Sequence, residues 1–205
     1  MLGLSPSTEV NKRISKEKLY ANASLTPQVR ELIKSQIEAV IWRNKLAEST
    51  VGIGVGKDIE EIQVFEVQLR QRELDKRALT AIAKAIPYKI LFMLVFEEEV
   101  QAWIEVEGVF YNTGWVITDT LLLRFEGLNL DTVYENLARQ ISGGRLGPDG
   151  DIAEAVECDK IRQKLEREIE ALEKKLLREK QFNRQVEING KLKRLRAERE
   201  EILYE

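Results

Sequence analysis

The chain has 205 residues, of which 43% are hydrophobic, and its 32 Lys and Arg residues nearly balance 35 Asp and Glu residues, leaving a net charge of −3. This length suits one compact domain of about 150 residues plus an extension, and no apolar run reaches the roughly 18 residues that span a bilayer. Histidine is absent, which excludes Ser-His-Asp and Cys-His catalytic sites and histidine-containing zinc sites. Carboxylate, lysine or hydroxyl chemistry remains, with magnesium on oxygen ligands as the metal option. Cys158 is the only cysteine, so no internal disulfide forms and a reducing cytoplasm is expected.

The first part of the chain carries one clear helix start and one clear strand. Residues 1–30 are predicted to be an extended arm that docks on the domain, because the basic stretch 10–16 lacks helical periodicity. Thr26 and Pro27 are an N-cap and a first-turn proline, and they begin a helix whose apolar face continues to Trp42 and Leu46. That face repeats every four residues, at Val29, Ile33, Ile37 and Ile41. Residues 62–69 are rich in β-branched and aromatic side chains and predict a strand.

The rest of the body is predicted to mix helices and strands. A helix over 73–86 is ended by Pro87, and residues 89–96 and 100–106 flank three glutamates as a hairpin. Short strands are expected over 109–111, 115–117 and 121–125. Asp131 is expected to cap a helix over 132–141, and the glycine-rich stretch 142–150 is a linker.

The tail, from about residue 153 to 204, contains no proline and combines heptad-spaced aliphatic residues with mixed charge. A single helix cannot bury such a stripe by itself, so we expect it to bind a facing helix. The register breaks between about residues 179 and 187, which fits either a local unwinding or the turn of a helical hairpin; the lack of glycine and proline there favours one irregular helix. The partner-binding residues expected on the two stripes are Leu165, Ile169, Leu172, Leu176, Ile188, Leu192, Leu195 and Ile202.

These patterns predict the α+β class: a mixed α/β body followed by a long C-terminal coiled-coil helix, with a helical hairpin as the alternative. The expected divisions are residues 1–141 for the α/β domain with its N-terminal arm, 142–150 for the linker and 151–205 for the coiled-coil tail.

Three motifs suggest chemistry, and each has a simpler structural explanation. The glycine-rich stretch 52–58 imitates a phosphate-binding loop, but its spacing is too short and Asp58 stands where a Ser or Thr is needed; a connection before a strand is favoured.

Glu38, Glu66 and Gln68, with Asp58 as an upstream acid, are arranged like the metal-binding residues of PD-(D/E)xK nucleases. The usual lysine is replaced by Gln68, so a Glu66 on the solvated side of an edge strand is the favoured interpretation.

A basic stripe is the third motif. Lys180, Arg184, Lys191 and Arg194 would stack along one continuous helix and follow a phosphate backbone. Glu187 and Glu198 interrupt the stripe, which favours a solvated flank of a coiled coil over a nucleic-acid site.

Several stretches together match one family pattern. They are residues 6–16, 36–46, 61–74, 85–96, 101–104 and 126–141, and the charged helical tail. In these stretches the chain resembles the bacterial and archaeal family catalogued as domain of unknown function 4391, which has no established activity and so supplies no catalytic residue. Members of that family tend to be encoded beside DNA helicases and site-specific DNA methyltransferases, in operons that look like restriction or antiphage clusters. The resemblance implies a partner of that class.

The combined expectation is a cytoplasmic, non-catalytic accessory subunit of a DNA helicase or methyltransferase complex in restriction or antiviral defence. It would self-associate or recruit its partner through the tail, contact nucleic acid only through the complex, and need no cofactor or metal. The alternative is a metal-dependent DNA nuclease of the PD-(D/E)xK type, active or degenerate. Convergence of Glu38, Glu66 and Gln68 in a cleft with another acid would favour the nuclease, and a solvent-facing Glu66 would exclude it.

Overall fold

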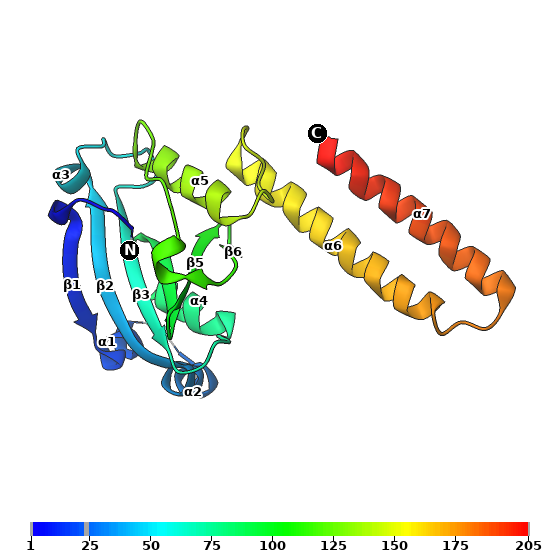
Figure 1. Ribbon diagram of the computed structural model, residues 1–205, viewed down its shortest axis with the longest axis horizontal. Coiled ribbons are helices and arrows are strands. Elements are labelled where there is room, and N and C mark those ends of the chain that lie inside the picture. Colours follow the sequence, from blue (N-terminus) through cyan, green and yellow to red (C-terminus); the bar gives the residue numbers. More distant parts are fainter. Residues whose placement is uncertain (1, 23–24, 205) are drawn as a thin grey trace. The chain divides into compact units, whose positions relative to one another are not determined.

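The computed structural model describes residues 2–22 and 25–204. The chain divides into two compact units, Met1–Gly144 and Arg145–Glu205, the first built on a sheet and the second on two helices (Figure 1). The α+β class predicted from the sequence is confirmed. Within the described ranges, no helix is both long enough and apolar enough to cross a membrane.

Seven strands of the first unit form one mixed sheet. Its order is β1 (Glu9–Ile14), β2 (Ile37–Ala47), β3 (Glu61–Leu69), β4 (Lys89–Phe96), β5 (Glu99–Val106) and β6 (Val109–Asn112), and β7 (Val116–Ile117) also pairs with β5. Among the strands of the described residues, β3 and β4 pair in parallel and the other neighbours are antiparallel. Parallel neighbours need a crossover, and α4 (Lys76–Lys84) provides it.

One face of this sheet is covered by three helices. The helices α1 (Lys16–Asn22), α2 (Pro27–Gln36) and α4 contribute Leu19, Ile33 and Leu79 to a core that includes Phe65 and Phe92 of the sheet. This face therefore holds the main hydrophobic core. The short elements of the unit are α3 (Glu48–Val51) and the 3-10 turns η1 (Pro6–Thr8) and η2 (Thr118–Thr120).

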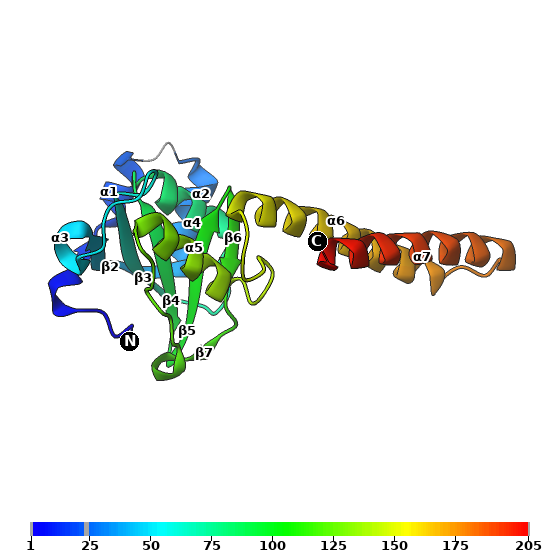
Figure 2. The same ribbon diagram turned by 90° about the horizontal axis from the view of Figure 1, so that it is seen from above.

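The helix α5 (Leu130–Ile141) packs against β3, β5 and β6. Trp103 of β5 belongs to the main core, and because neighbours along a strand alternate in face, the fully buried Ile104 lies on the opposite face. On that side α5 buries Val133, Leu137 and Ile141, and the Tyr134 hydroxyl donates to the Glu105 carbonyl oxygen at 2.8 Å. Burial raises the pKa of Tyr134. Figure 2 presents the sheet and its helices from a second direction.

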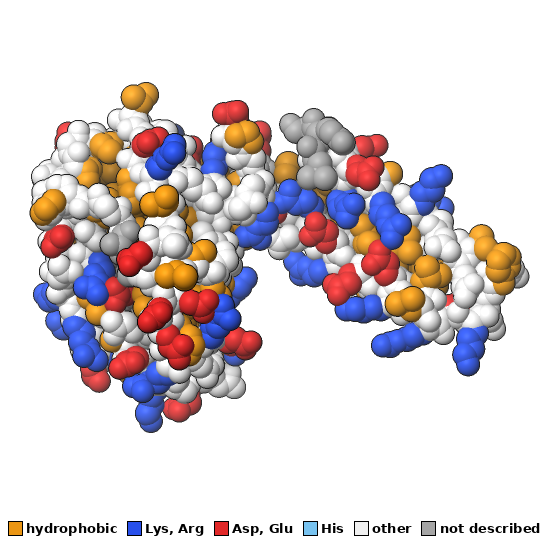
Figure 3. All heavy atoms as spheres, viewed as in Figure 1, with side chains coloured by type: hydrophobic (Ala, Val, Ile, Leu, Met, Phe, Trp, Pro, Cys, Tyr) orange, Lys and Arg blue, Asp and Glu red, His pale blue; other side chains and the backbone are white. Residues whose placement is uncertain are grey.

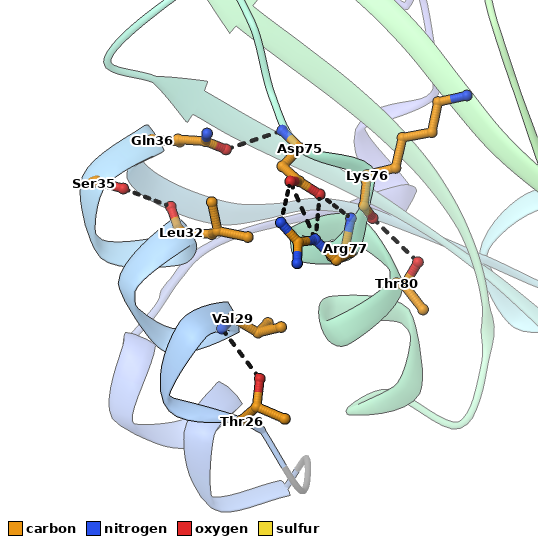
Figure 4. Close-up of polar contacts among 9 residues, drawn as sticks. All are labelled: Thr26, Val29, Leu32, Ser35, Gln36, Asp75, Lys76, Arg77 and Thr80. Atoms are coloured by element: carbon orange, nitrogen blue, oxygen red, sulfur yellow. Dashed lines mark hydrogen bonds and ion pairs between the residues drawn. The ribbon is translucent and has the colours of Figure 1, made fainter.

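The predicted start of α2 is confirmed, and the last residue of α2 is hydrogen-bonded to the N-cap of α4. Thr26 Oγ1 accepts a hydrogen bond from the Val29 backbone N–H at 3.4 Å, and Pro27 stands in the first turn. At the other end, the Gln36 side-chain oxygen accepts from the backbone N–H of Asp75, the N-cap of α4, at 2.9 Å (Figure 4). Hydrogen bonds from the Arg77 side chain and backbone N–H lower the pKa of Asp75, which stabilises the ionised cap.

Two predictions at the start of the chain need correction. The helix of residues 26–46 ends at Gln36, and residues 37–47 form β2. The spacing of four continues past Gln36, but Ile37 and Ile41 do not share a face: Ile37 belongs to the main core, whereas Ile41 pairs with Glu66, because the register shifts between Ile37 and Ala39. The predicted arm does dock on the domain, as the edge strand β1 paired with β2, but it is not extended throughout, because the short helix α1 follows β1.

Two further predictions need correction. Residues 121–125 form no strand; the Gln140 side chain pairs with both backbone groups of Arg124 in place of a neighbouring strand. The last helix of the body begins at Leu130, and Asn129, rather than Asp131, is its N-cap. The Asn129 side chain accepts from the Thr132 backbone N–H at 2.9 Å, which leaves Asp131 available for another contact.

The second unit is an antiparallel helical hairpin. Asp151 caps α6 (Ile152–Leu176), and α7 (Phe182–Tyr204) returns alongside it (Figure 1). The prediction of one irregular helix is therefore wrong, and the alternative of a hairpin holds. The turn needs neither glycine nor proline because the Glu179 side chain accepts from the backbone N–H groups of Lys180 and Gln181, each at 2.9 Å.

Candidate functional site

The sheet carries a buried carboxylate on β3. Glu66 is only 4% exposed, and β3 is an interior strand between β2 and β4, so the expectation of a solvated edge strand is wrong. One carboxylate oxygen accepts from Arg43 Nε at 2.8 Å and the other from Gln68 Nε2 at 2.9 Å. Burying a charge is costly unless it is paired, and Arg43 supplies that pairing.

Two backbone irregularities place Arg43 against Glu66. The pairing of β2 with β3 shifts register between Trp42 and Asn44, and the pairing of β1 with β2 shifts between Glu9 and Lys12. Bulges of this kind redirect a side chain and often occur beside functional sites. Within the second one, Asn11 has a φ of 49°, and its side-chain oxygen accepts from Arg43 Nη1 at 3.2 Å.

These groups line a pocket of about 290 Å³. Its polar lining is Glu9, Asn11, Arg43, Asn44 and Glu66, and its apolar lining includes Leu2, Leu4, Val64 and Met93. Glu9 is thus a second acid in the cleft, but its carboxylate already accepts from Asn11 Nδ2 at 3.2 Å. Across residues 2–22 and 25–204, no group of three or more acidic, cysteine or histidine side chains could hold a metal ion. The pocket groups can donate and accept hydrogen bonds: Arg43 and Asn44 carry N–H donors, and Glu9 and Glu66 carry carboxylate acceptors.

The proposed nuclease residues come together only in part. Glu66 and Gln68 touch, whereas Glu38 is exposed at the start of β2 and does not line the pocket. Asp58 is exposed in the connection before β3, eight residues before Glu66 in the chain. The convergence of Glu38, Glu66 and Gln68 with another acid is not observed, and neither is a solvent-facing Glu66.

The glycine-rich loop binds an anion of the chain itself. Asp131, in the first turn of α5, accepts from the backbone N–H groups of Lys57 at 2.6 Å and Ile59 at 2.8 Å, with longer contacts to Asp58 N–H at 3.3 and 3.4 Å. A Cβ atom on Gly56 would lie 2.1 Å from this carboxylate. The N–H groups that would cradle a phosphate are thus occupied by Asp131, and the glycine is needed for close approach.

The eight tail residues expected to meet a partner mostly face each other. Ile169, Ile188 and Leu192 form a buried cluster, with Leu172, Leu176 and Leu195 partly buried against it. Leu165 is buried and Ile202 is half-buried. The facing stripe that the sequence requires is therefore provided within the chain, by the second helix of the hairpin.

The basic residues do not form one stripe. Lys180 lies in the turn before α7, and Arg184 is 3.9 Å from the Glu179 carboxylate. Lys191 and Arg194 line a groove on the hairpin together with Glu168 and Glu198. The turn breaks the continuous helix on which the stripe depended, and acidic side chains stand beside the remaining bases.

Sequence reasoning missed two residues that organise the first unit, Arg43 and Asp131. Arg43 is placed by a bulge, which no local pattern predicts. Asp131 contacts a loop more than 70 positions earlier, and a helix-capping interpretation accounted for it equally well.

Together, the two units define an α+β protein whose sheet unit carries a salt-bridged polar pocket and whose second unit is a helical hairpin. The family model described as "Domain of unknown function (DUF4391)" matches residues 2–198. The chain belongs to the DUF4391 family. No curated protein and no solved structure matched the chain.

Proposed function

We propose that this protein is a cytoplasmic, non-catalytic accessory subunit of a DNA helicase or DNA methyltransferase complex in restriction or antiphage defence. In this role the hairpin docks on the enzyme and also mediates self-association, while the sheet unit serves as the folded body. The genomic neighbourhood typical of the family supports the class of partner, and the hairpin supports the mode of contact.

The observation that carries the proposal is the apolar end of the hairpin. Leu177 is 87% exposed, Phe182 is 75% exposed and Val186 is 54% exposed, and all three lie at or beside the turn between α6 and α7. Hydrophobic side chains are gathered at this end of the hairpin (Figure 3). Clustered exposed apolar residues mark interaction sites, and an aromatic residue at the centre of such a cluster is a typical binding hot spot.

The test is co-purification of the tagged chain with the helicase or methyltransferase encoded beside it. Phe182→Asp should reduce the recovered enzyme by about tenfold or more, because it puts a charge into the contact. Leu122→Asp is the matched control, since Leu122 is 86% exposed but lies in the first unit. Circular dichroism checks that both variants stay folded. Equal recovery with Phe182→Asp and wild type would contradict the proposal.

The alternative, a PD-(D/E)xK-type nuclease, keeps one specific observation in its favour: Glu66 lines a pocket that also contains Glu9. It is tested by incubating the purified protein, alone and with the partner helicase, with linear, single-stranded and methylated DNA in Mg²⁺ or Mn²⁺. We expect no cleavage. Cleavage that is lost in Glu66→Ala would reverse the ranking of the two functions.

A further inference from the structure

The hairpin has a groove that its own two helices leave open. The groove has a volume of about 530 Å³ and lies on the second unit alone. Its apolar lining is Ala171, Leu172 and Leu195, and its charged lining is Glu168, Lys191, Arg194 and Glu198. Leu172 and Leu195 are only partly buried against the hairpin cluster, so the seam continues into the groove.

The charges around this groove have no partner in the described chain. Some charges outside the groove pair within the hairpin, such as Lys174 with Glu170 at 2.6 Å and Arg196 with Glu173 at 2.7 Å, whereas others, such as Lys164 and Lys193, make no ion pair within the described residues. No ion pair or side-chain hydrogen bond within the described residues involves the four charged side chains of the groove. Two acids and two bases also cancel, so the rim offers no net attraction for a phosphate backbone.

The order of charge along α7 matches a second copy of the same helix. Lys191 lies nearer the turn and Glu198 farther from it, seven residues or about 10.5 Å apart. When a second α7 lies antiparallel, with the two-fold axis midway between Arg194 and Leu195, Lys191 of each copy stands opposite Glu198 of the other. In such a symmetric interface each contact occurs twice, and Arg194 and Leu195 of the two copies lie nearest the axis.

We infer that two copies of this chain associate through these grooves, pairing their hairpins as an antiparallel four-helix bundle. The inference rests on the proposed function only in treating the hairpin as an assembly element, and it uses a different surface from the Phe182 end. Four helices around one core bury the apolar stripes that two helices leave half exposed. The Lys191 to Glu198 pairs set the antiparallel alignment, as charged flanks do in other helical assemblies.

A charge-swap experiment on the full chain tests this interface, with sedimentation velocity over a range of concentrations as the measurement. Wild type should form dimers at concentrations below about 100 μM. Lys191→Glu and Glu198→Lys should each weaken dimerisation by about tenfold, because each creates two like-charge contacts. The double variant Lys191→Glu/Glu198→Lys should recover most of that loss, since the pairs are restored with their signs exchanged.

The matched control is Lys193→Glu, which reverses the charge of an exposed α7 residue outside the groove lining and should leave dimerisation unchanged. A monomeric wild type, or a double variant as weak as the single ones, would overturn the inference. So would salt-sensitive binding of duplex DNA that is lost in Lys191→Glu while the dimer persists. Phe182→Asp should leave the dimer intact, so failure of the groove and failure of the proposed partner contact give different results.

Discussion

Replacing Asp131 by alanine should destabilise the first unit strongly, because its carboxylate accepts the backbone N–H groups at the end of the glycine-rich loop. The carboxylate makes two short bonds, to Lys57 N–H at 2.6 Å and Ile59 N–H at 2.8 Å. Hydrogen bonds to a charged group contribute about 1.5–3 kcal/mol each. Since the released Lys57 N–H can bind water, we expect a loss of about 2–4 kcal/mol out of the roughly 5–15 kcal/mol typical of a domain.

The assay is urea unfolding followed by tryptophan fluorescence. All three tryptophans lie within residues 1–144, so the signal reports on this unit and not on the hairpin. Asp131→Asn should lose about as much as Asp131→Ala, because one acceptor oxygen remains but the amide NH2 group then faces a backbone N–H donor. Asp119→Ala is the control, since Asp119 is exposed and no hydrogen bond or ion pair within the described residues involves it. A change below about 0.5 kcal/mol for Asp131→Ala, together with unchanged amide exchange at Lys57 and Ile59, would refute the reasoning.

Two further predictions concern buried and turn-forming carboxylates. Arg43→Met should destabilise the first unit by about 1–3 kcal/mol, which is below the usual cost of breaking a buried pair because the Arg43 side chain is 40% exposed. The double variant Arg43→Met/Glu66→Met should recover part of this loss. Urea unfolding measures the stability of both variants, and equal stability of Arg43→Met and wild type contradicts the pairing. Backbone hydrogen bonds, the largest from Gln181 N–H, lower the pKa of Glu179, so its contribution to stability is complete above its unfolded pKa and disappears as the pH falls through the lower folded value. Thermal melting by circular dichroism between pH 7 and 3 should therefore show a smaller acid destabilisation for Glu179→Gln than for wild type, and identical pH profiles would count against this role for the turn.

Local patterns were sufficient wherever the signal lies within a few residues. The capping of α2 by Thr26, strand β3, the hairpin of β4 and β5, and a helix over residues 132–141 all follow from side-chain spacing and turn chemistry. The heptad residues of the tail also correctly indicated a helix that packs against another helix.

The tertiary structure decided the features that depend on distant contacts. The spacing of Ile37 and Ile41 continues the helical repeat, but β2 forms there because β3 pairs with it along its length and β1 pairs with it from Val40 onward. The partner of the tail stripe is the chain's own α7, because Glu179 closes a turn without glycine or proline. Glu66 is buried beside Arg43 only because a bulge turns that arginine toward it. Spacing along the chain thus determined which residues need a partner, whereas the three-dimensional packing determined which partner each one has.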